Sequence, residues 1–542
     1  MAQVNNLTAA ENTAVLDAAH VGDIRGALGT IRQQDLATRR SWKARLLTLL
    51  AVMGPGLIVM VGDNDAGGVA TYAQAGQNYG TSLLWVLLLL IPVLIVNQEM
   101  VVRLGLVSGV GHARLIFERF GKFWGAFSVG DLFLLNFLTI ITEFIGVTLA
   151  IEAFGASKYI AVPVTAAVLI GMTVTGSFRR WERFMFVLVS ANFAVIPLAL
   201  MSHPSLGPVA HDFFVPGIGG GLNSTVMLLI IGLVGTTVAP WQLFFQQSNV
   251  IDKRLTPRWM AYERADTVIG SVVVIIGAAA LVITTAFAFQ GTPQFGGFVD
   301  AGTVITGLTH NVGRTAGLVF AIVLLNASLI GAAAVTLSTS YAFGDVFSIK
   351  HSLHRGWRDA VGFYSIYAAL VALAGAVVLL PGAPLGLITT GVQALAGVLL
   401  PSATVFLVLL CNDRAVLGPW VNRPWLNAVA GLIVGVLVML SLILAATTLF
   451  PSIDVTMLAG ILALVLVLGL IVSALMRIRR GGATGSAGTT LDRATWRMPP
   501  LDSLPRPAWS PTRKVGMLTL RIYLVVAVLL VVLKVVNLAL GH

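Results

Sequence analysis

The stretch Gly62-Asp63-Asn64-Asp65-Ala66-Gly67-Gly68 places two carboxylates and three glycines inside an apolar run that extends from residue 47 to residue 75. A membrane-spanning helix needs roughly 20 apolar residues, and an Asp at its centre costs about 2.5 to 3.5 kcal/mol on insertion scales. Such a carboxylate normally faces a cavity, a partner or an ion. We therefore predict an interrupted helix whose break holds polar groups at membrane depth.

The composition of the whole chain also indicates a membrane protein. Of its 542 residues, 57% are hydrophobic and 11% are charged, whereas about a quarter of the residues in soluble domains are charged. The single cysteine, Cys411, permits no internal disulfide, and its apolar surroundings argue against a thiolate metal site. The formal net charge of +11 lies in loops between apolar runs, so we expect a lipid bilayer and no nucleic acid as partner.

The length criterion predicts about thirteen membrane-spanning helices in an all-α chain. Arg521 and Lys534 interrupt the last of them, and long basic side chains can snorkel from a helix toward the headgroups. The predicted spans cover residues 47–75, 81–100, 123–153, 158–178, 184–202, 222–249, 266–290, 314–345, 358–381, 384–411, 425–449, 455–476 and 517–540.

Loop charge predicts the orientation of these spans. Basic clusters follow the second, fourth, sixth, eighth, tenth and twelfth spans, while the intervening loops contain almost no Lys or Arg. The positive-inside rule then places the N-terminus in the cytoplasm. We expect a multi-pass protein of the plasma membrane, that is, the cell inner membrane. With thirteen spans, the C-terminus lies outside.

A second interruption falls in the sixth predicted span, at Gly235-Thr236-Thr237-Val238-Ala239-Pro240-Trp241-Gln242. Pro240 removes a backbone donor and frees carbonyls near Thr236. Because the first and sixth spans begin units of five helices, the two units enter the membrane in opposite directions, as in secondary transporters with inverted repeats. Pro and Gly kinks around a buried, backbone-satisfied Asp are the alternative. Carboxylates and freed carbonyls are hard oxygen donors, so the predicted substrate is a hard cation.

The predicted spans divide the chain into six parts. They are a cytoplasmic tail (1–46), the first inverted repeat (47–204), the second inverted repeat (222–412), two further spans (425–476), a flexible cytoplasmic linker (477–516) and an additional C-terminal span (517–542). The linker prediction rests on a Gly-Gly-Ala-Thr-Gly-Ser run and on two adjacent prolines.

Several motifs, taken in order, resemble those of the natural resistance-associated macrophage protein (NRAMP) family of divalent-metal transporters. The resemblance covers most of the first eleven spans and implies a leucine-transporter-like fold. The matching residues are Gly54-Pro55-Gly56, Asp65-Ala66-Gly67-Gly68, Val69-Ala70-Thr71, Leu84-Trp85-Val86, Arg103-Leu104-Gly105, Glu143-Phe144-Ile145-Gly146, and Gln393, twenty residues before Asp413.

The resemblance also implies a metal site. Asp65 corresponds to the principal anionic ligand, and the Gly62 and Thr236 carbonyls and the Gln393 side chain would contribute directly or through water. Gly68 and Ala239 stand where the family has an Asn and a Met ligand. The metal would be a transported substrate, because the resemblance implies no resident cofactor, and the protein is expected to be a monomer.

Departures from the family pattern favour its magnesium-transporting branch. Ala239-Pro240-Trp241 replaces a Met-Pro-His motif, and Ile140 replaces an Asp of the family's proton route. Loss of the thioether suits Mg²⁺, which takes oxygen ligands and keeps several waters. We therefore expect uptake of Mg²⁺, and also of Mn²⁺, by alternating access without proton coupling.

Two other functions remain open at this point. One is proton-coupled Mn²⁺ or Fe²⁺ transport, as in the main branch of the family. The other is a membrane-embedded, Mg-dependent enzyme, although the chain contains no HExxH, Walker A or Gly-x-Ser-x-Gly motif.

The remaining polar residues near the two breaks have alternative roles. Asp63 and Asn64 are either further metal-site residues or caps of the half-helix that begins near Gly67. Glu143 either bonds the third span to the first or lies on the ion pathway, with the bond favoured. Trp241, Gln242 and Gln246 either line that pathway or pack and tie helices together. Away from the breaks, Glu99 is within reach of Arg103 at i+4.

Overall fold

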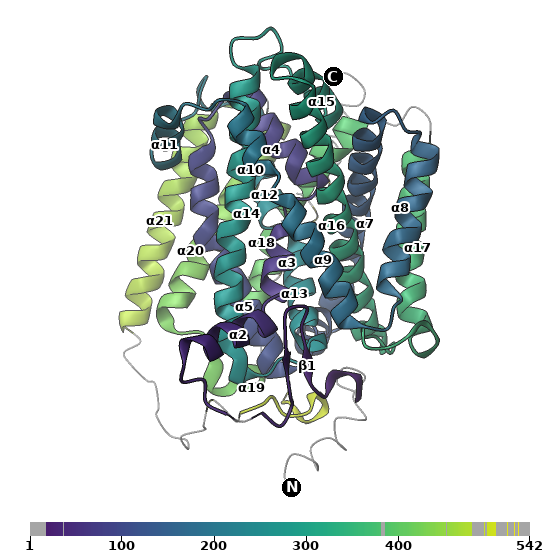
Figure 1. Ribbon diagram of the computed structural model, residues 1–542. Coiled ribbons are helices and arrows are strands. Elements are labelled where there is room, and N and C mark those ends of the chain that lie inside the picture. Colours follow the sequence, from purple (N-terminus) through teal and green to yellow (C-terminus); the bar gives the residue numbers. More distant parts are fainter. Residues whose placement is uncertain are drawn as a thin grey trace.

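The computed structural model describes residues 18–35, 37–380, 385–450, 453–479, 493 and 496–505, together with the isolated positions 518, 525 and 529. Within these residues the only strands are β1 (Ile24–Arg25) and β2 (Thr30–Ile31), which pair antiparallel, and the other regular elements are helices (Figure 1). The all-α prediction is confirmed.

The described helices correspond to the first twelve predicted spans. Ten are long and apolar enough to cross a membrane: α5 (Leu84–Ser108), α7 (Lys122–Ala153), α9 (Phe178–Asn192) with α10 (Val195–Met201), α12 (Ser224–Thr237) with α13 (Pro240–Asp252), α14 (Met260–Phe289), α16 (Arg314–Phe347), α17 (Val361–Leu379), α18 (Leu385–Cys411), α20 (Pro424–Leu449) and α21 (Val455–Arg479). The shorter apolar helix α8 (Lys158–Thr173) takes the place of the fourth span, and the pair α3 (Pro55–Val61) and α4 (Ala66–Tyr79) takes the place of the first. The predicted span 517–540 lies outside the described residues, apart from three isolated positions.

The two predicted interruptions lie next to each other in the interior of the bundle. One separates α3 from α4, and the other separates α12 from α13. The half-helix α4 packs against α12, while α3 packs against α13, and α14 runs alongside both α3 and α4 (Figure 1). The two broken helices of a leucine-transporter-like fold are therefore present and in contact.

The beginning of the first span differs from the prediction. Residues 47–52 belong to a separate helix, α2 (Trp42–Val52), which is inclined by 55° to α3. The bend occurs at Gly54, whose φ of 150° is unfavourable for residues with a side chain, and Pro55 then opens α3. An apolar sequence alone could not separate α2 from the span.

Short helices occupy several connections for which the sequence predicted only loops. Each is shorter than a membrane span, so the length criterion passes over it. They are α6 (His112–Phe120), α11 (Leu206–Phe214), α15 (Ala301–Asn311), α19 (Arg414–Leu417) and the 3-10 turns η1 (Ala18–His20), η2 (Pro257–Trp259), η3 (Trp357–Asp359), η4 (Gly418–Trp420) and η5 (Leu501–Ser503).

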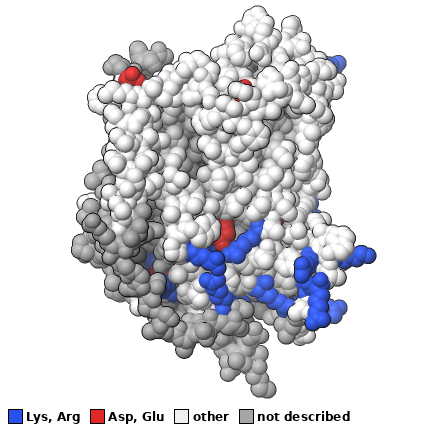
Figure 2. Space-filling view, turned by 90° about the vertical axis from the view of Figure 1, so that its left-hand side faces the viewer, with Lys and Arg blue, Asp and Glu red and all other residues white. Residues whose placement is uncertain are grey.

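Lys and Arg side chains gather at one end of the bundle, which we call the basic end (Figure 2). Helices α2 and α19 lie there, whereas α11 and α15 lie at the opposite end (Figure 1). The described parts of the predicted tail and linker are folded against the basic end. Ile24 and Ile31 are buried, Arg119 Nη1 donates to the Pro505 carbonyl over 2.7 Å, and Met498 N donates to the Val107 carbonyl over 3.3 Å.

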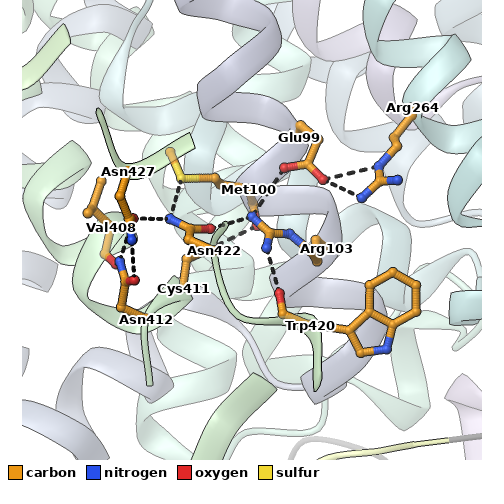
Figure 3. Close-up of polar contacts among 10 residues, drawn as sticks. All are labelled: Glu99, Met100, Arg103, Arg264, Val408, Cys411, Asn412, Trp420, Asn422 and Asn427. Carbon is orange, nitrogen blue, oxygen red and sulfur yellow. Dashed lines mark hydrogen bonds and ion pairs between the residues drawn. The ribbon is translucent and has the colours of Figure 1, made fainter. Parts of the chain in front are cut away.

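Arg103 is the centre of a polar cluster at the basic end (Figure 3). Its guanidinium donates to the Trp420 carbonyl over 2.5 Å and to Asn422 Oδ1 over 2.6 Å. It also pairs with Glu99 over 3.2 Å, as the i+4 spacing predicts, and Glu99 in turn pairs with Arg264 over 2.6 Å. The cluster therefore joins α5 to α14 and to the connection between α18 and α20.

Candidate metal site

Asp65 is the N-cap of α4. Its Oδ1 accepts a hydrogen bond from the Gly68 N–H over 2.6 Å, which satisfies one of the free donors at the start of the helix. Before it, Asp63 N and Asn64 N donate to the Met60 and Val61 carbonyls and close the last turn of α3. The break thus places the Asp65 carboxylate at the beginning of a helix in the middle of the bundle.

The end of α12 supplies the opposite side of the break. Because Pro240 has no N–H, the Thr236 carbonyl loses the helical partner it would otherwise have. Thr236 Oγ1 is buried and has no hydrogen-bond partner among the described residues. A hydrogen bond of 2.8 Å between Tyr72 Oη and Thr237 Oγ1 fixes α12 against α4.

Two glycines allow the predicted ligands to approach one another. A methyl group added at Gly68 would lie 3.1 Å from Thr236 Oγ1 and 3.3 Å from Asp65 Oδ1. One added at Gly67 would lie 1.7 Å from Gln393 Nε2. The structure therefore brings Asp65, Thr236, Gln393 and Gly68 together from α4, α12 and α18, as the metal-site hypothesis requires.

Gly62 and Ala239 lie on the two chain segments that form the breaks. Gly62 ends α3, and a methyl group added there would lie 3.1 Å from Trp241 Cη2. Ala239 precedes Pro240 in extended conformation and is 6% exposed. Trp241 is buried, its Nε1 has no partner in the described part of the chain, and it packs against Phe245.

Glu143 lies beside Asp65. Its Oε2 accepts from the Ala66 N–H over 3.1 Å, so the predicted bond between the third span and the first is confirmed. A methyl group added at Gly331 would lie 2.6 Å from Glu143 Cδ and 2.8 Å from Asp65 Cβ. Glu143 Oε1 has no hydrogen-bond partner within the described ranges, and its role on an ion pathway stays a prediction.

The proposed capping role of Asp63 and Asn64 is wrong, because Asp65 is the residue that caps α4. Asn64 Nδ2 donates instead to the Val274 carbonyl of α14 over 3.2 Å. Asp63 is fully buried, and neither of its carboxylate oxygens has a partner in the part of the chain that the structure describes. The alternative role of Asp63 as a metal-site residue stays a prediction.

Gln242 and Gln246 tie α13 to its neighbours. Gln242 Oε1 accepts from Gln98 Nε2 of α5 over 2.8 Å, and Gln246 Nε2 donates to Thr267 Oγ1 of α14 over 3.1 Å. Their structural role is therefore confirmed. A second role in lining an ion pathway remains a prediction.

Several buried polar atoms at the breaks have no hydrogen-bond partner among the described residues. Buried polar groups are nearly always hydrogen-bonded in proteins, so each exception needs an explanation. Here the described residues include no group of three His, Cys, Asp or Glu side chains close enough to hold a metal. An ion at this site would therefore depend on one or two carboxylates together with amide, hydroxyl and carbonyl oxygens and water.

A small pocket lies beside the break, on its side toward the end opposite the basic one (Figure 1). It is lined by Ala66, next to Asp65, and by Asp300, at the N-terminus of α15. Thr142 and Thr389 add hydroxyl groups to its wall.

The structure adds residues that the sequence did not single out. Tyr72 and Thr237 fix the two broken helices to each other, and no sequence signal marks them. Gly331 gives Glu143 and Asp65 the space they occupy. Its position in the small-residue run Gly331-Ala332-Ala333-Ala334 could have indicated close helix packing.

The two broken helices and the buried polar site between them define a multi-pass membrane transporter of the leucine-transporter-like fold. The model of the natural resistance-associated macrophage protein-like family matches residues 56–447, and the chain belongs to this family.

Comparisons with individual proteins agree with this assignment. The chain is 27% identical over 426 residues to the divalent metal cation transporter MntH of Latilactobacillus sakei, covering 75% of this chain and 90% of that protein. It is 28% identical over 430 residues to a protein of the same name from Xylella fastidiosa, covering 77% and 88%. These relatives are named as transporters, and the enzyme alternative is set aside.

The fold is shared with a solved manganese transporter from Eremococcus coleocola. The two structures superpose with a TM-score of 0.61 at 20% sequence identity, over 82% of this chain and 98% of the other. At that identity the likeness establishes the fold alone.

Proposed function

We propose that this chain carries a divalent metal cation across the membrane by alternating access, with Mg²⁺ as main substrate and Mn²⁺ also accepted. The ion would bind where the two helix breaks meet. Asp65 would be the principal anionic ligand. The Gly62 and Thr236 carbonyls and the Gln393 amide would contribute directly or through water, and Asp63 would add a second carboxylate.

The observation that carries this proposal is the set of buried, unpartnered polar atoms at the breaks. Both Asp63 oxygens, Asn64 Oδ1 and Thr236 Oγ1 lack hydrogen-bond partners among the described residues. Hard oxygen donors at the end of a half-helix in the middle of a membrane protein are suited to a small cation. The relatives named as divalent metal cation transporters support a divalent ion.

The preference for Mg²⁺ rests on the residues that differ from the family pattern. Ala239 supplies no thioether, and Gly68 supplies no side-chain ligand. A site of oxygen donors with spare room suits an ion that keeps several of its waters, whereas a thioether favours softer transition metals. The substitution Ala239→Met should therefore raise uptake of Mn²⁺ and Cd²⁺ relative to Mg²⁺, and Ala239→Leu is the size-matched control.

The absence of proton coupling rests on Ile140 and Trp241, which stand where the family has an Asp and a His of its proton route. Glu143 favours the alternative of proton-coupled Mn²⁺ or Fe²⁺ transport, because it touches α4 beside Asp65 and keeps one oxygen unpartnered among the described residues. A pH-sensitive dye inside proteoliposomes distinguishes the two. We expect no change of internal pH during uptake, and acidification in step with metal entry would establish the coupled alternative.

The basic end would face the cytoplasm, and the chain would reside in the plasma membrane. The clustering of Lys and Arg at that end supports this orientation (Figure 2). The pocket beside Ala66 would then lie on the outer side of the break.

The decisive experiment measures metal uptake into proteoliposomes that contain the purified protein, with protein-free liposomes as the control. Mg²⁺ and Mn²⁺ should both enter and compete with each other, while Ca²⁺ enters poorly because it demands more ligands than this site offers. Equal rates with and without the protein would refute transport. Entry of Mn²⁺ that Mg²⁺ does not inhibit would refute the proposed metal preference.

A further inference from the structure

Residues 18–35 form a folded segment at the basic end, which we call the N-terminal latch. It contains η1 and the two short strands. Its residues Ile24, Ala27 and Ile31 are buried, each with an exposed fraction of 5% or less. The family match begins only at residue 56. The latch therefore lies outside the part of the chain that the family model covers.

The latch is bonded to a fully buried ion pair. Ala27 N donates to Glu182 Oε2 of α9, and Glu182 Oε1 pairs with Lys253 Nζ, just after α13, over 2.6 Å. Neither charged side chain is exposed at all. Lys253 Nζ also donates to the Met53 carbonyl over 2.7 Å, directly before α3. One short chain of contacts therefore runs from the latch to α9, α13 and the start of the first broken helix.

Arg254 makes a second set of bonds to the latch. Its Nε donates to the Ala19 carbonyl over 2.8 Å, and its Nη1 donates to the Asp23 carbonyl over 3.4 Å. Its backbone φ of 66° is unfavourable for a residue with a side chain. A methyl group added at Gly22 would lie 2.8 Å from Arg254 Nη1, so the latch backbone fits closely around the guanidinium.

The same region fixes the start of α3. Asp266 of α14 accepts hydrogen bonds from the Gly54, Gly56 and Leu57 N–H groups over 3.0, 2.7 and 3.2 Å. Against α2, a methyl group added at Gly29 would lie 2.8 Å from Ala51 Cβ. The latch, α2 and the first turn of α3 thus form one layer that is held to α9, α13 and α14 at the basic end.

Buried polar atoms without partners lie between this layer and the metal site. Gln246 and Asn249 follow Gln242 at helical spacing on one face of α13. Within the described residues, Gln246 Oε1, both polar atoms of the Asn249 amide and both carboxylate oxygens of Glu263 have no partner, although all three residues are fully buried. Glu263 lies one turn before Thr267, to which Gln246 is bonded. Groups of this kind would be hydrated if the basic end opened.

We propose that the N-terminal latch holds the basic end of the transporter closed, and that it must leave Arg254 and the Glu182–Lys253 pair before the ion can pass along this face of α13. The proposal rests on the proposed function, because alternating access requires the basic end to open. Under this proposal the bonds between the latch and the bundle are made in the closed state and lost when the basic end opens, so the latch sets how often it opens.

The test measures how readily a thiol reagent reaches the polar face behind the latch. Asn249→Cys, in a chain that also carries Cys411→Ala, reports access when the purified full chain reacts with a maleimide. Three changes weaken the latch independently: deletion of residues 1–35, Arg254→Ala, and Ala27→Pro, which removes the N–H donor to Glu182. Arg25→Ala is the matched control, because its side chain is 61% exposed and forms a 3.9 Å ion pair with Asp23, within the latch itself.

Each weakened latch should increase the labelling rate about tenfold, the shift expected when the charged hydrogen bonds of the closed state are lost. Arg25→Ala should label at the parent rate. Unchanged labelling in all three variants, each monodisperse by size exclusion, would overturn the latch. Labelling needs no transport, so the same measurement in an Asp65→Asn background tests the latch even if Mn²⁺ uptake is absent and the proposed function fails.

Discussion

Asp65 has two roles that substitutions can separate. Its Oδ1 caps α4 by accepting from the Gly68 N–H over 2.6 Å, and its charge is the proposed anchor for the metal. Asp65→Asn retains an oxygen acceptor for the cap and removes the charge. Asp65→Ala removes both. Comparison of the two variants therefore measures the cap and the charge independently.

The structure sets the expected magnitudes. Loss of an N-cap costs about 0.5 to 2 kcal/mol. Gly68 is buried in the bundle, and leaving a buried N–H without a partner costs about 1 to 3 kcal/mol. Both ranges describe the loss of the same hydrogen bond, so they are not added. We expect Asp65→Ala to lower the free energy of unfolding by roughly 1 to 3 kcal/mol more than Asp65→Asn, since Asn caps about as well as Asp.

Transport should respond differently from stability. Removing a residue that only hydrogen-bonds to a metal ligand lowers metal affinity about 10- to 100-fold. Removing the anionic ligand itself should cost at least as much, so we expect both variants to lower uptake by roughly 100-fold or more. The assays are Mn²⁺ uptake into proteoliposomes and unfolding by SDS titration. Full uptake by Asp65→Asn would show that Asp65 only caps α4, and the metal-site argument would fail.

Three further outcomes can be checked. Gly67→Ala should push the flexible Gln393 amide out of the site, because the added methyl would lie 1.7 Å from its Nε2; we expect about tenfold weaker metal uptake with no loss of stability by SDS titration. Arg103→Ala should destabilise the basic end by about 3 kcal/mol, because it breaks a largely buried ion pair, while uptake per folded molecule stays unchanged. Burial by itself lowers the pKa of His351, but the hydrogen bond to Asp345 and the negative charge of that carboxylate together raise it by a larger amount. The pKa of His351 therefore lies above its ordinary value. The stability from this pair is complete below about pH 6.5 and is lost as pH rises through the raised pKa, so the difference in unfolding free energy between the parent and His351→Gln should be larger at pH 6 than at pH 9.

The sequence predicted the positions of the first twelve spans and of both breaks because these features have strong local signals. Apolar runs of sufficient length mark the helices, and the motifs at Asp65 and Pro240 interrupt two of them. Helices too short to cross a membrane carry no such signal, so α11 and α15 were not predicted. The bend before α3 depends on the backbone angle of Gly54, which an apolar pattern does not reveal.

The candidate site was predictable only as a set of residues. Sequence spacing could not decide which of Asp63, Asn64 and Asp65 caps α4, because all three are good capping residues within one turn. The outcome depends on where the neighbouring helices lie. The Asn64 side chain donates a hydrogen bond to the Val274 carbonyl of α14, and Asp65 is the residue that caps α4.

The contacts of α4 indicate why ion binding and the integrity of the broken helix are linked. A helix that starts inside a membrane protein has free N–H groups that need partners within the protein. Two of them are bonded to carboxylates, Ala66 N to Glu143 and Gly68 N to Asp65. These acids are therefore held at the break by the helix itself, whereas the polar atoms of Asp63 and Thr236 have no partner in the described part of the chain. A cation that binds there would provide a partner for these atoms of Asp63 and Thr236. Occupancy of the site should therefore favour the conformation in which the two breaks face each other.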